Sequence, residues 1–286
     1  MFREEVGIKL PTKKRKERHE KAMLLRENIH KSGDYFEVDI FPIKKIACGR
    51  SSKLHLTSET QRKLNERNVQ RRLTWIIQEN FTPEDVLLTL TYPQNVHITP
   101  EQGRKDLENY LRRIRYALNK QNIKLKYISK TEIGTLKGRV HHHVIISGDL
   151  GRDYLEQQWK DKVNGLATTR YIEFYENGVS GLAEYITKDN SLAYRSYNCS
   201  KNLKRPEAEK QDGRITIKKL QDLRNDIHNA EAFERLYPGY RFVEADPFFN
   251  EYFFDSVSRE VERVELPYIN IKMYKKDSTY IRRGFR

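Results

Sequence analysis

The sequence predicts an α+β fold in which helices cover an antiparallel β-sheet. Short apolar runs typical of strands alternate with longer segments whose apolar residues recur at helical spacing. Two of the strand-like runs are joined by Gly134 to Gly138, a connection whose length and glycines are typical of a β-hairpin. The predicted order is helix, strand, helix, strand, strand, helix, strand, helix. One antiparallel sheet packed against helices satisfies this order best.

The helices are predicted from capping signals and apolar spacing. Residues 58–61 form a capping box, and apolar residues at helical spacing continue to about residue 79. Thr99 is a suitable N-cap, and Pro100 suits the first turn of a helix that we expect to end near Lys120. Two further helices are expected over residues 153–163 and 179–189.

Strands are expected between these helices, over residues 85–92, 124–133, 139–147 and 169–175. The glycine-containing connection joins the second of them to the third. The charged segment before about residue 34 predicts either a weakly stable helix or a basic arm. We therefore expect a basic arm and lead-in over residues 1–56, one folded domain over 57–206, and a C-terminal extension of unknown role over 207–286.

The composition predicts a protein that contacts phosphates. The formal net charge is +14, and 33% of the residues are charged. Cys48 and Cys199 lie outside any metal-binding spacing, so we expect packing roles rather than a disulfide scaffold or a zinc ribbon. No apolar run is long enough to cross a bilayer, and Met1 precedes charged residues rather than a signal-peptide core. We expect a cytosolic protein without a membrane partner.

The strongest chemical signal is the run His141-His142-His143 within the apolar residues 140–146. Alternate residues of a strand share a face, so His141 and His143 are expected on one face and His142 on the other. Two imidazoles in this arrangement form half of a divalent-metal site. The alternatives are three structural, hydrogen-bonded histidines, or a shifted site built from His142 and His143.

Glu132 is the candidate third ligand. If the hairpin loop leaves four residues unpaired, Glu132 lies opposite His141 and faces the same way, whereas a tighter register places Thr131 there. Two imidazoles and one carboxylate suit Mn²⁺, Mg²⁺ or Zn²⁺. With two histidines Mn²⁺ is the better chemical match, although Mg²⁺ is the abundant ion in cells.

Tyr185 and Lys188 lie on the last predicted helix and suggest nucleophilic chemistry. Tyr185 falls at the edge of the apolar stripe, and Lys188 is its neighbour three residues on. Ionising a free phenol at neutral pH costs about 4 kcal/mol, which a metal-bound phosphate and a nearby ammonium would offset. We expect Lys188 to act by its charge rather than as a base. The alternative is an ordinary core-edge tyrosine beside a Glu184–Lys188 ion pair.

Basic side chains next to these motifs are candidate DNA contacts. Three lie on the predicted helix from residue 101 to 120, and three follow the tyrosine: Arg112, Arg113, Arg115, Lys201, Lys204 and Arg205. The alternative is that these residues form a solvated surface.

Three motifs in this order resemble the HUH (His-hydrophobic-His) endonucleases. Within them the chain is similar to the rolling-circle replication initiators of small single-stranded-DNA phages, plasmids and related mobile elements. The motifs are Leu88-Thr-Leu-Thr-Tyr92, Gly138-Arg-Val-His-His-His143 with Glu132 upstream, and Ala183-Glu-Tyr-Ile-Thr-Lys188. The resemblance covers about residues 57–206 and implies an HUH-type sheet with flanking helices.

The resemblance also implies an activity and partners. His141 and His143 would hold a divalent metal, and Tyr185 would attack origin DNA to leave a 5′-phosphotyrosine and a free 3′-hydroxyl. A host polymerase would extend that end, and a host helicase would unwind the DNA, because the chain has no Walker A pattern. The expected location is the cytoplasm of a bacterial host. A single-tyrosine transposase or relaxase, and a DNA-binding regulator without catalysis, are the rival hypotheses.

Overall fold

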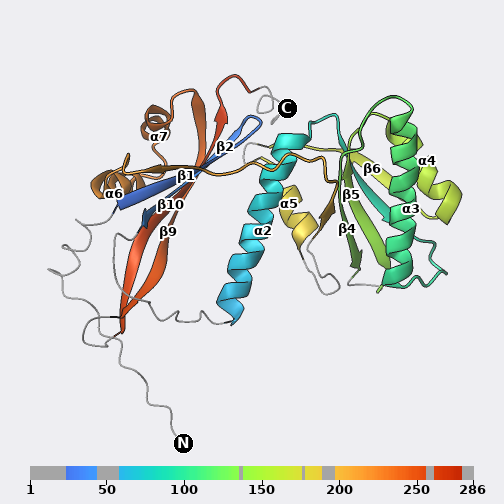
Figure 1. Cartoon of the computed structure of the whole chain (residues 1–286), viewed down its shortest axis with the longest axis horizontal. Helices are drawn as coiled ribbons and strands as arrows, with labels where there is room; N and C mark the ends of the chain where they lie inside the picture. The colour runs from blue at the N-terminus through green and yellow to red at the C-terminus, as the bar shows by residue number, and fades with distance from the viewer. Residues whose placement is uncertain are drawn as a thin grey trace, which may run out of the picture. The chain divides into compact units, whose positions relative to one another are not determined.

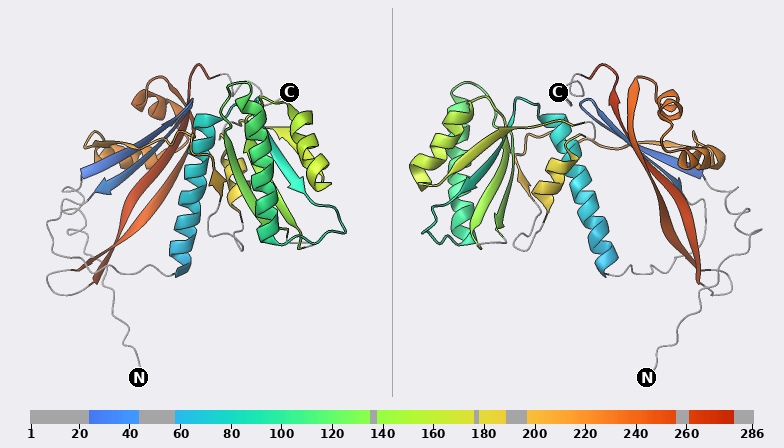
Figure 2. Two further views of the ribbon diagram at one scale, coloured as in Figure 1. Left: turned by 45° about the vertical axis from the view of Figure 1, so that its right-hand side comes forward. Right: turned by 180° about the vertical axis from the view of Figure 1, so that it is seen from behind.

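The computed structural model describes residues 24–43, 58–134, 138–175, 178–188, 197–255 and 261–278 (Figures 1 and 2). The chain forms two compact units, which we describe separately. The central unit comprises Lys63–Pro206 with Tyr280–Arg286, and the terminal unit comprises Met1–Arg62 with Glu207–Thr279. Each unit contains a five-stranded sheet, so the predicted α+β class is confirmed. None of the helices in the described ranges is both long enough and apolar enough to cross a membrane.

The sheet of the central unit has the strand order β6-β3-β5-β4-β7. All neighbouring strands are antiparallel. The strands are β3 (Val86–Thr91), β4 (Tyr127–Ile133), β5 (Val140–Ile146), β6 (Ala167–Tyr171) and β7 (Asn198–Cys199). The histidine-containing strand β5 is therefore the middle strand, with a hydrogen-bonded neighbour on each side.

One face of this sheet is covered by α3 (Pro100–Asn119) and α4 (Arg152–Val163) (Figure 1). The helix α3 begins as predicted, because the Thr99 side chain accepts a hydrogen bond from the backbone N–H of Gln102 at 3.2 Å. Leu107 and Ile114 of α3 pack in the same core as the apolar side chains of β3 and β5. Trp159 of α4 is fully buried and donates a hydrogen bond to the carbonyl of Thr91 at 2.8 Å.

The opposite face is covered by α2 (Ser58–Asn80) and α5 (Ser180–Thr187) (Figure 1). Leu73 and Ile77 of α2 share a core with Ala183 and Ile186 of α5 and with the apolar side chains of this face, among them Ile145. The apolar stripe of α5 is therefore buried, as its spacing predicts. The two faces of the sheet have separate cores.

The helices and strands predicted between residues 58 and 188 are present, with ends that differ by a few residues. The largest difference is β6, which was expected over residues 169–175. Its partner β3 begins at Val86, which pairs with Tyr171, and Ile172 instead donates its backbone N–H to Asp85. The strand therefore ends where its partner begins. Residue 189, the expected end of the last helix, lies outside the described residues.

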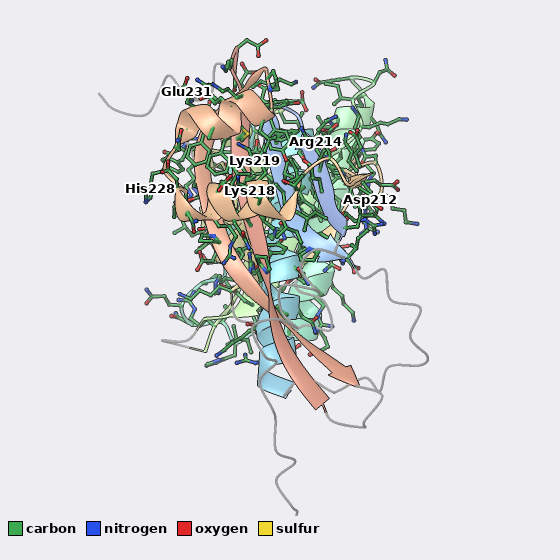
Figure 3. All side chains as sticks on the ribbon, turned by 90° about the vertical axis from the view of Figure 1, so that its left-hand side faces the viewer. Asp212, Arg214, Lys218, Lys219, His228 and Glu231 are labelled. Carbon is green, nitrogen blue, oxygen red and sulfur yellow. The ribbon has the colours of Figure 1, made fainter. Side chains whose placement is uncertain are left out.

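The sheet of the terminal unit has the order β8-β1-β2-β10-β9 and combines strands from both ends of the chain. The strands are β1 (Leu24–Ser32), β2 (Tyr35–Ile43), β8 (Glu209–Asp212), β9 (Tyr240–Asp255) and β10 (Val261–Lys275). Two helices, α6 (Ile217–Asn225) and α7 (Ala230–Leu236), pack on one face through Leu220, Leu223 and Phe233. Figure 3 shows these helices over the strands, with Lys218 and Lys219 on α6 and Glu231 on α7.

The predicted arm or weak helix before residue 34 is wrong for Leu24–Ser32, which form β1. Its apolar side chains, such as Ile29, are buried, while Arg26 and Lys31 form ion pairs with Asp212 and Glu209 of β8. The charges that suggested a solvated segment are thus neutralised by a strand far along the chain, which local periodicity does not reveal. Residues 1–23 lie outside the described part. The roles expected for residues 1–56 and 207–286 stay predictions.

Candidate metal centre

The strands β4 and β5 place a carboxylate opposite a histidine. Glu132 pairs with His141, and Thr131 pairs with His142. The longer of the two hairpin registers considered above is therefore confirmed. Because alternate residues of a strand share a face, His143 lies on the same face as His141 and Glu132.

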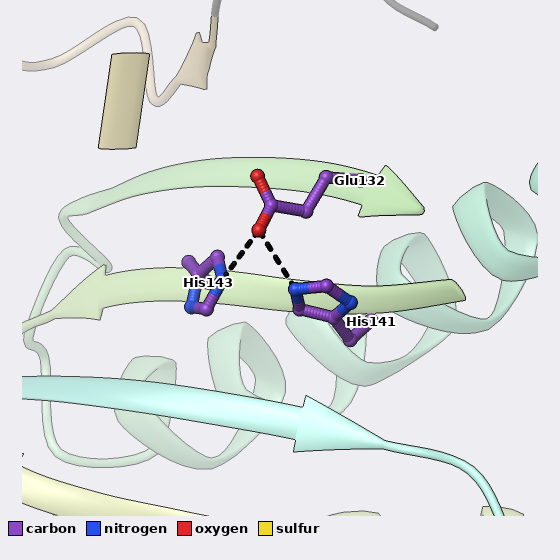
Figure 4. A group of neighbouring side chains, drawn as sticks. All are labelled: Glu132, His141 and His143. Carbon is purple, nitrogen blue, oxygen red and sulfur yellow. Dashed lines mark hydrogen bonds and ion pairs between the residues drawn. The ribbon is translucent and has the colours of Figure 1, made fainter. Parts of the chain in front are cut away.

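The three side chains converge on one point (Figure 4). Oε1 of Glu132 lies 2.7 Å from Nε2 of His141 and 3.1 Å from Nε2 of His143. One ligand atom from each residue lies within 4.8 Å of the others, so the group could hold a metal ion. The structure does not identify the ion.

The other ring nitrogen of each histidine has its own partner, as is usual for imidazoles that bind metals. Nδ1 of His141 lies 3.3 Å from the carbonyl of Arg139, and Nδ1 of His143 lies 3.4 Å from Oγ1 of Thr89. If each Nδ1 carries the proton and donates it to that oxygen, each Nε2 has a free lone pair. The donor set therefore fits a divalent cation.

A lysine that the sequence analysis missed completes the surroundings of Glu132. Lys130 is 2% exposed, and its ammonium lies 3.0 Å from Oε2 of Glu132. Burial works against the charged carboxylate, but hydrogen bonds from His141, His143 and Lys130 outweigh it and hold the pKa of Glu132 well below its usual range. The available signal was strand parity, since a lysine two residues before Glu132 shares its face.

His142 lies on the other face and is fully buried. Its Nε2 is 3.1 Å from the hydroxyl of Tyr92, and its Nδ1 is 2.8 Å from Oγ1 of Thr131. Burial, with a smaller contribution from the neighbouring histidines, lowers the pKa of His142 to about 3. The ring is therefore neutral at physiological pH and belongs to the hydrogen-bonded core beneath α3 and α4. A site built from His142 and His143 is incompatible with this placement.

Tyr185 of α5 approaches the same group. Its hydroxyl lies 3.4 Å from both ring nitrogens of His143, and the side chain remains 42% exposed. Burial and the charge of Glu132 raise the pKa of the Tyr185 phenol, while Arg170 and a hydrogen bond with Thr89 act in the opposite direction. The phenol is accessible to a substrate, but it needs positive charge nearby to ionise.

Arg170 supplies such a charge, and Lys188 does so less directly. The guanidinium of Arg170 lies 5.9 Å from the centroid of the Tyr185 ring. Lys188 is the C-cap of α5, with extended backbone and an exposed side chain, so the helical neighbourhood expected for Tyr185 and Lys188 ends at this residue. The sequence analysis missed Arg170, although its position in the strand-like run 169–175 was visible; its face depended on pairing with Leu87.

The basic candidates lie elsewhere in the central unit. Arg112, Arg113 and Arg115 belong to α3, which covers the face opposite to His141. Arg113 donates a hydrogen bond to the carbonyl of Gln158 at 3.0 Å, which ties α3 to α4. The exposed side chains of the second cluster, beyond β7, are Lys201, Lys204 and Arg205. Contact of these residues with DNA stays a prediction.

Comparison with known proteins gives one family. Residues 85–190 match the family model of the replication-associated protein ORF2. The matched segment runs from the residue before β3 to just beyond α5, and so contains Glu132, His141, His143 and Tyr185. Searches of curated proteins and of solved structures found no match.

Proposed function

We propose that the chain initiates rolling-circle DNA replication as a metal-dependent nickase and ligase of single-stranded origin DNA. One observation carries the proposal: the hydroxyl of Tyr185 lies beside His143 in the group formed with Glu132 and His141. A nucleophile beside a cation site that a phosphate can enter is the arrangement that phosphodiester transfer requires. The match to a replication-associated family over the same residues supports the replication role.

In the proposed step, the oxygen of Tyr185 forms a bond to phosphorus while the bond from phosphorus to the 3′ oxygen breaks. The phenol loses its proton, and the released 3′ oxygen takes one up from solvent, so that protons balance. The products are a 5′-phosphotyrosine and a free 3′-hydroxyl, and the reverse reaction joins the ends. One phosphodiester replaces another, so no nucleotide hydrolysis is needed.

The residues around Tyr185 have complementary roles in this proposal. A divalent cation held by Glu132, His141 and His143, Mn²⁺ or Mg²⁺, would polarise the phosphate and offset its charge. Arg170 faces the phenol ring and opposes the rise in pKa that burial and Glu132 impose on it. The exposed Lys188 would contact the phosphate only once DNA is bound. We expect a host polymerase to use the 3′-hydroxyl and a host helicase to unwind the duplex.

The first test is adduct formation with labelled single-stranded DNA from the replicon that encodes the protein. In Mn²⁺ the wild-type chain should form a covalent protein–DNA adduct that resists denaturation. Tyr185→Phe should reduce the adduct by more than about 1,000-fold, because the phenylalanine ring offers no nucleophile. Chelation of the metal should have a similar effect.

Tyr175→Phe is the matched control, because Tyr175 is a well-exposed tyrosine of the same unit that does not belong to the metal group. It should form the adduct at the wild-type rate. An adduct that survives Tyr185→Phe would assign the nucleophile to another residue. DNA binding without any adduct would favour the non-catalytic regulator, and an adduct with transposon ends or a transfer origin instead of a replication origin would favour the transposase or relaxase.

A further inference from the structure

The ammonium of Lys130 is buried in the middle of the central sheet. Lysine is among the residues least often buried, because removing an ammonium from water is costly unless it is paired. Lys130 has two partners in the described residues. Its Nζ lies 3.0 Å from Oε2 of Glu132, and it donates a hydrogen bond to the backbone carbonyl of Lys188.

The contact with Glu132 divides the work of the two carboxylate oxygens. Oε1 faces Nε2 of His141 and Nε2 of His143, while Oε2 faces Lys130. A carboxylate held in this way cannot rotate without breaking an ion pair. The lysine therefore orients Oε1 toward the point at which the histidine nitrogens converge.

The contact with Lys188 reaches the helix that carries the tyrosine. Lys188 caps the C-terminus of α5, and its N–H donates to the carbonyl of Glu184 in the last helical turn. A cation at this position interacts favourably with the negative end of the helix and satisfies a carbonyl that has no partner within it. Tyr185 lies in this last turn, so the same ammonium holds both the metal carboxylate and the end of the tyrosine helix.

We propose that Lys130 is a positioning residue that couples the metal site to the placement of Tyr185. This inference rests on the proposed function for its catalytic meaning, but its physical content can be tested without DNA. Lys130 orients Glu132 for the cation and fixes the last turn of α5 against the same strand. Loss of the lysine would disturb both at once.

Lys126 provides a matched control. It precedes Lys130 by four residues, and its Nζ lies 3.5 Å from the carbonyl of Asn80, the last residue of α2. Both lysines therefore contact a carbonyl at the end of a helix on the same side of the sheet. The difference is that Lys126 forms no ion pair with Glu132 in the described residues.

The experiment measures Mn²⁺ binding to the full-length chain in the absence of DNA. Lys130→Met should weaken binding about tenfold, as is usual when a partner of a metal-ligating side chain is removed, whereas Lys126→Met should change it less than twofold. In a Glu132→Gln background, Lys130→Met should cause no further weakening. A lysine that acted by charge alone would repel Mn²⁺, so its removal would tighten binding in both backgrounds and overturn the proposal. Equal weakening in both backgrounds would show a merely structural role and would also overturn it.

Amide hydrogen exchange tests the second half of the coupling. Mn²⁺ should slow exchange at the backbone N–H of Lys188 in the wild-type chain and in Lys126→Met, but not in Lys130→Met. Equal slowing in all three would overturn the proposal. If Lys130→Met does not fold, Lys130→Gln keeps a hydrogen-bond donor and should show the same losses to a smaller degree. These results do not depend on whether Tyr185 proves to be the nucleophile, so the two proposals can fail separately.

Discussion

The two faces of β5 use the same residue type in opposite ways. On one face, His141 and His143 meet Glu132, and the hydrogen bond with Glu132 raises the pKa of His141 although burial opposes the rise. On the other face, His142 is enclosed by Tyr92, Thr131 and Trp159, and burial lowers its pKa to about 3. Adjacent histidines therefore differ because the pleat of the strand turns them toward different surroundings.

This difference teaches that the tripeptide itself contains no site. The face covered by α2 and α5 leaves Tyr185 partly exposed beside the imidazoles, whereas α3 and α4 seal the other face with Trp159 and Tyr110. A histidine is a candidate ligand on the first face and a core residue on the second. The following predictions test this contrast.

The largest expected effect distinguishes His143 from His142. His143→Ala should weaken Mn²⁺ binding by about 100-fold or more, because a ligand is lost, whereas His142→Phe should change it less than about threefold. Titration of the metal-free protein with Mn²⁺, with free ion measured by electron paramagnetic resonance, checks both variants. Comparable weakening in the two variants would remove the distinction between the faces.

A smaller effect is expected for two arginines that stack on tyrosines on opposite faces. Arg170 lies over Tyr185, and Arg152 lies 5.3 Å from the centroid of Tyr171 on the α4 side. Arg170→Gln should slow adduct formation about 10- to 100-fold without changing Mn²⁺ affinity, because a cation near the reacting phosphate stabilises developing charge. Arg152→Gln should leave the rate within about twofold of the wild-type rate. Adduct kinetics at saturating Mn²⁺ compare them, and equal losses would argue against a special role for Arg170.

The smallest effect concerns the pH dependence of stability in the metal-free protein. Below about pH 6.5 the unfolded chain binds a proton at His142, whereas the folded chain does not until about pH 3. Stability should therefore fall with decreasing pH, and His142 should contribute up to about 1.4 kcal/mol per pH unit. The raised pKa of His141 acts above this window and the lowered pKa of Glu132 acts below it.

His142→Phe should flatten that slope between about pH 6.5 and pH 4.5, at a cost of about 1–3 kcal/mol near neutral pH for the lost hydrogen bonds. Urea unfolding in the presence of a chelator, followed by tryptophan fluorescence, measures it. Both tryptophans of the chain, Trp75 and Trp159, belong to the central unit, so the signal reports on that unit. An unchanged slope in the variant would show that His142 is not the group responsible.

Local spacing was sufficient for much of the central unit. The face of His141 and His143, the pairing of Glu132 with His141, the Thr99 cap and the buried stripe of α5 all depend on residues close together in the sequence, where period and turn length act directly. The terminal unit was not accessible in this way. The strand β1 pairs with β2 next to it, but also with β8, which lies about 180 residues away.

The sequence by itself thus determined which residues could form a metal group, because strand parity and hairpin register are local properties of the chain. Only the tertiary structure decided which charges serve that group. Lys130 reaches the end of α5, Arg170 reaches Tyr185 across strands, and Lys188 lies beyond the helix instead of beside the tyrosine. These contacts join segments that are distant in the sequence, and their distances depend on how helices and strands pack rather than on any periodic pattern.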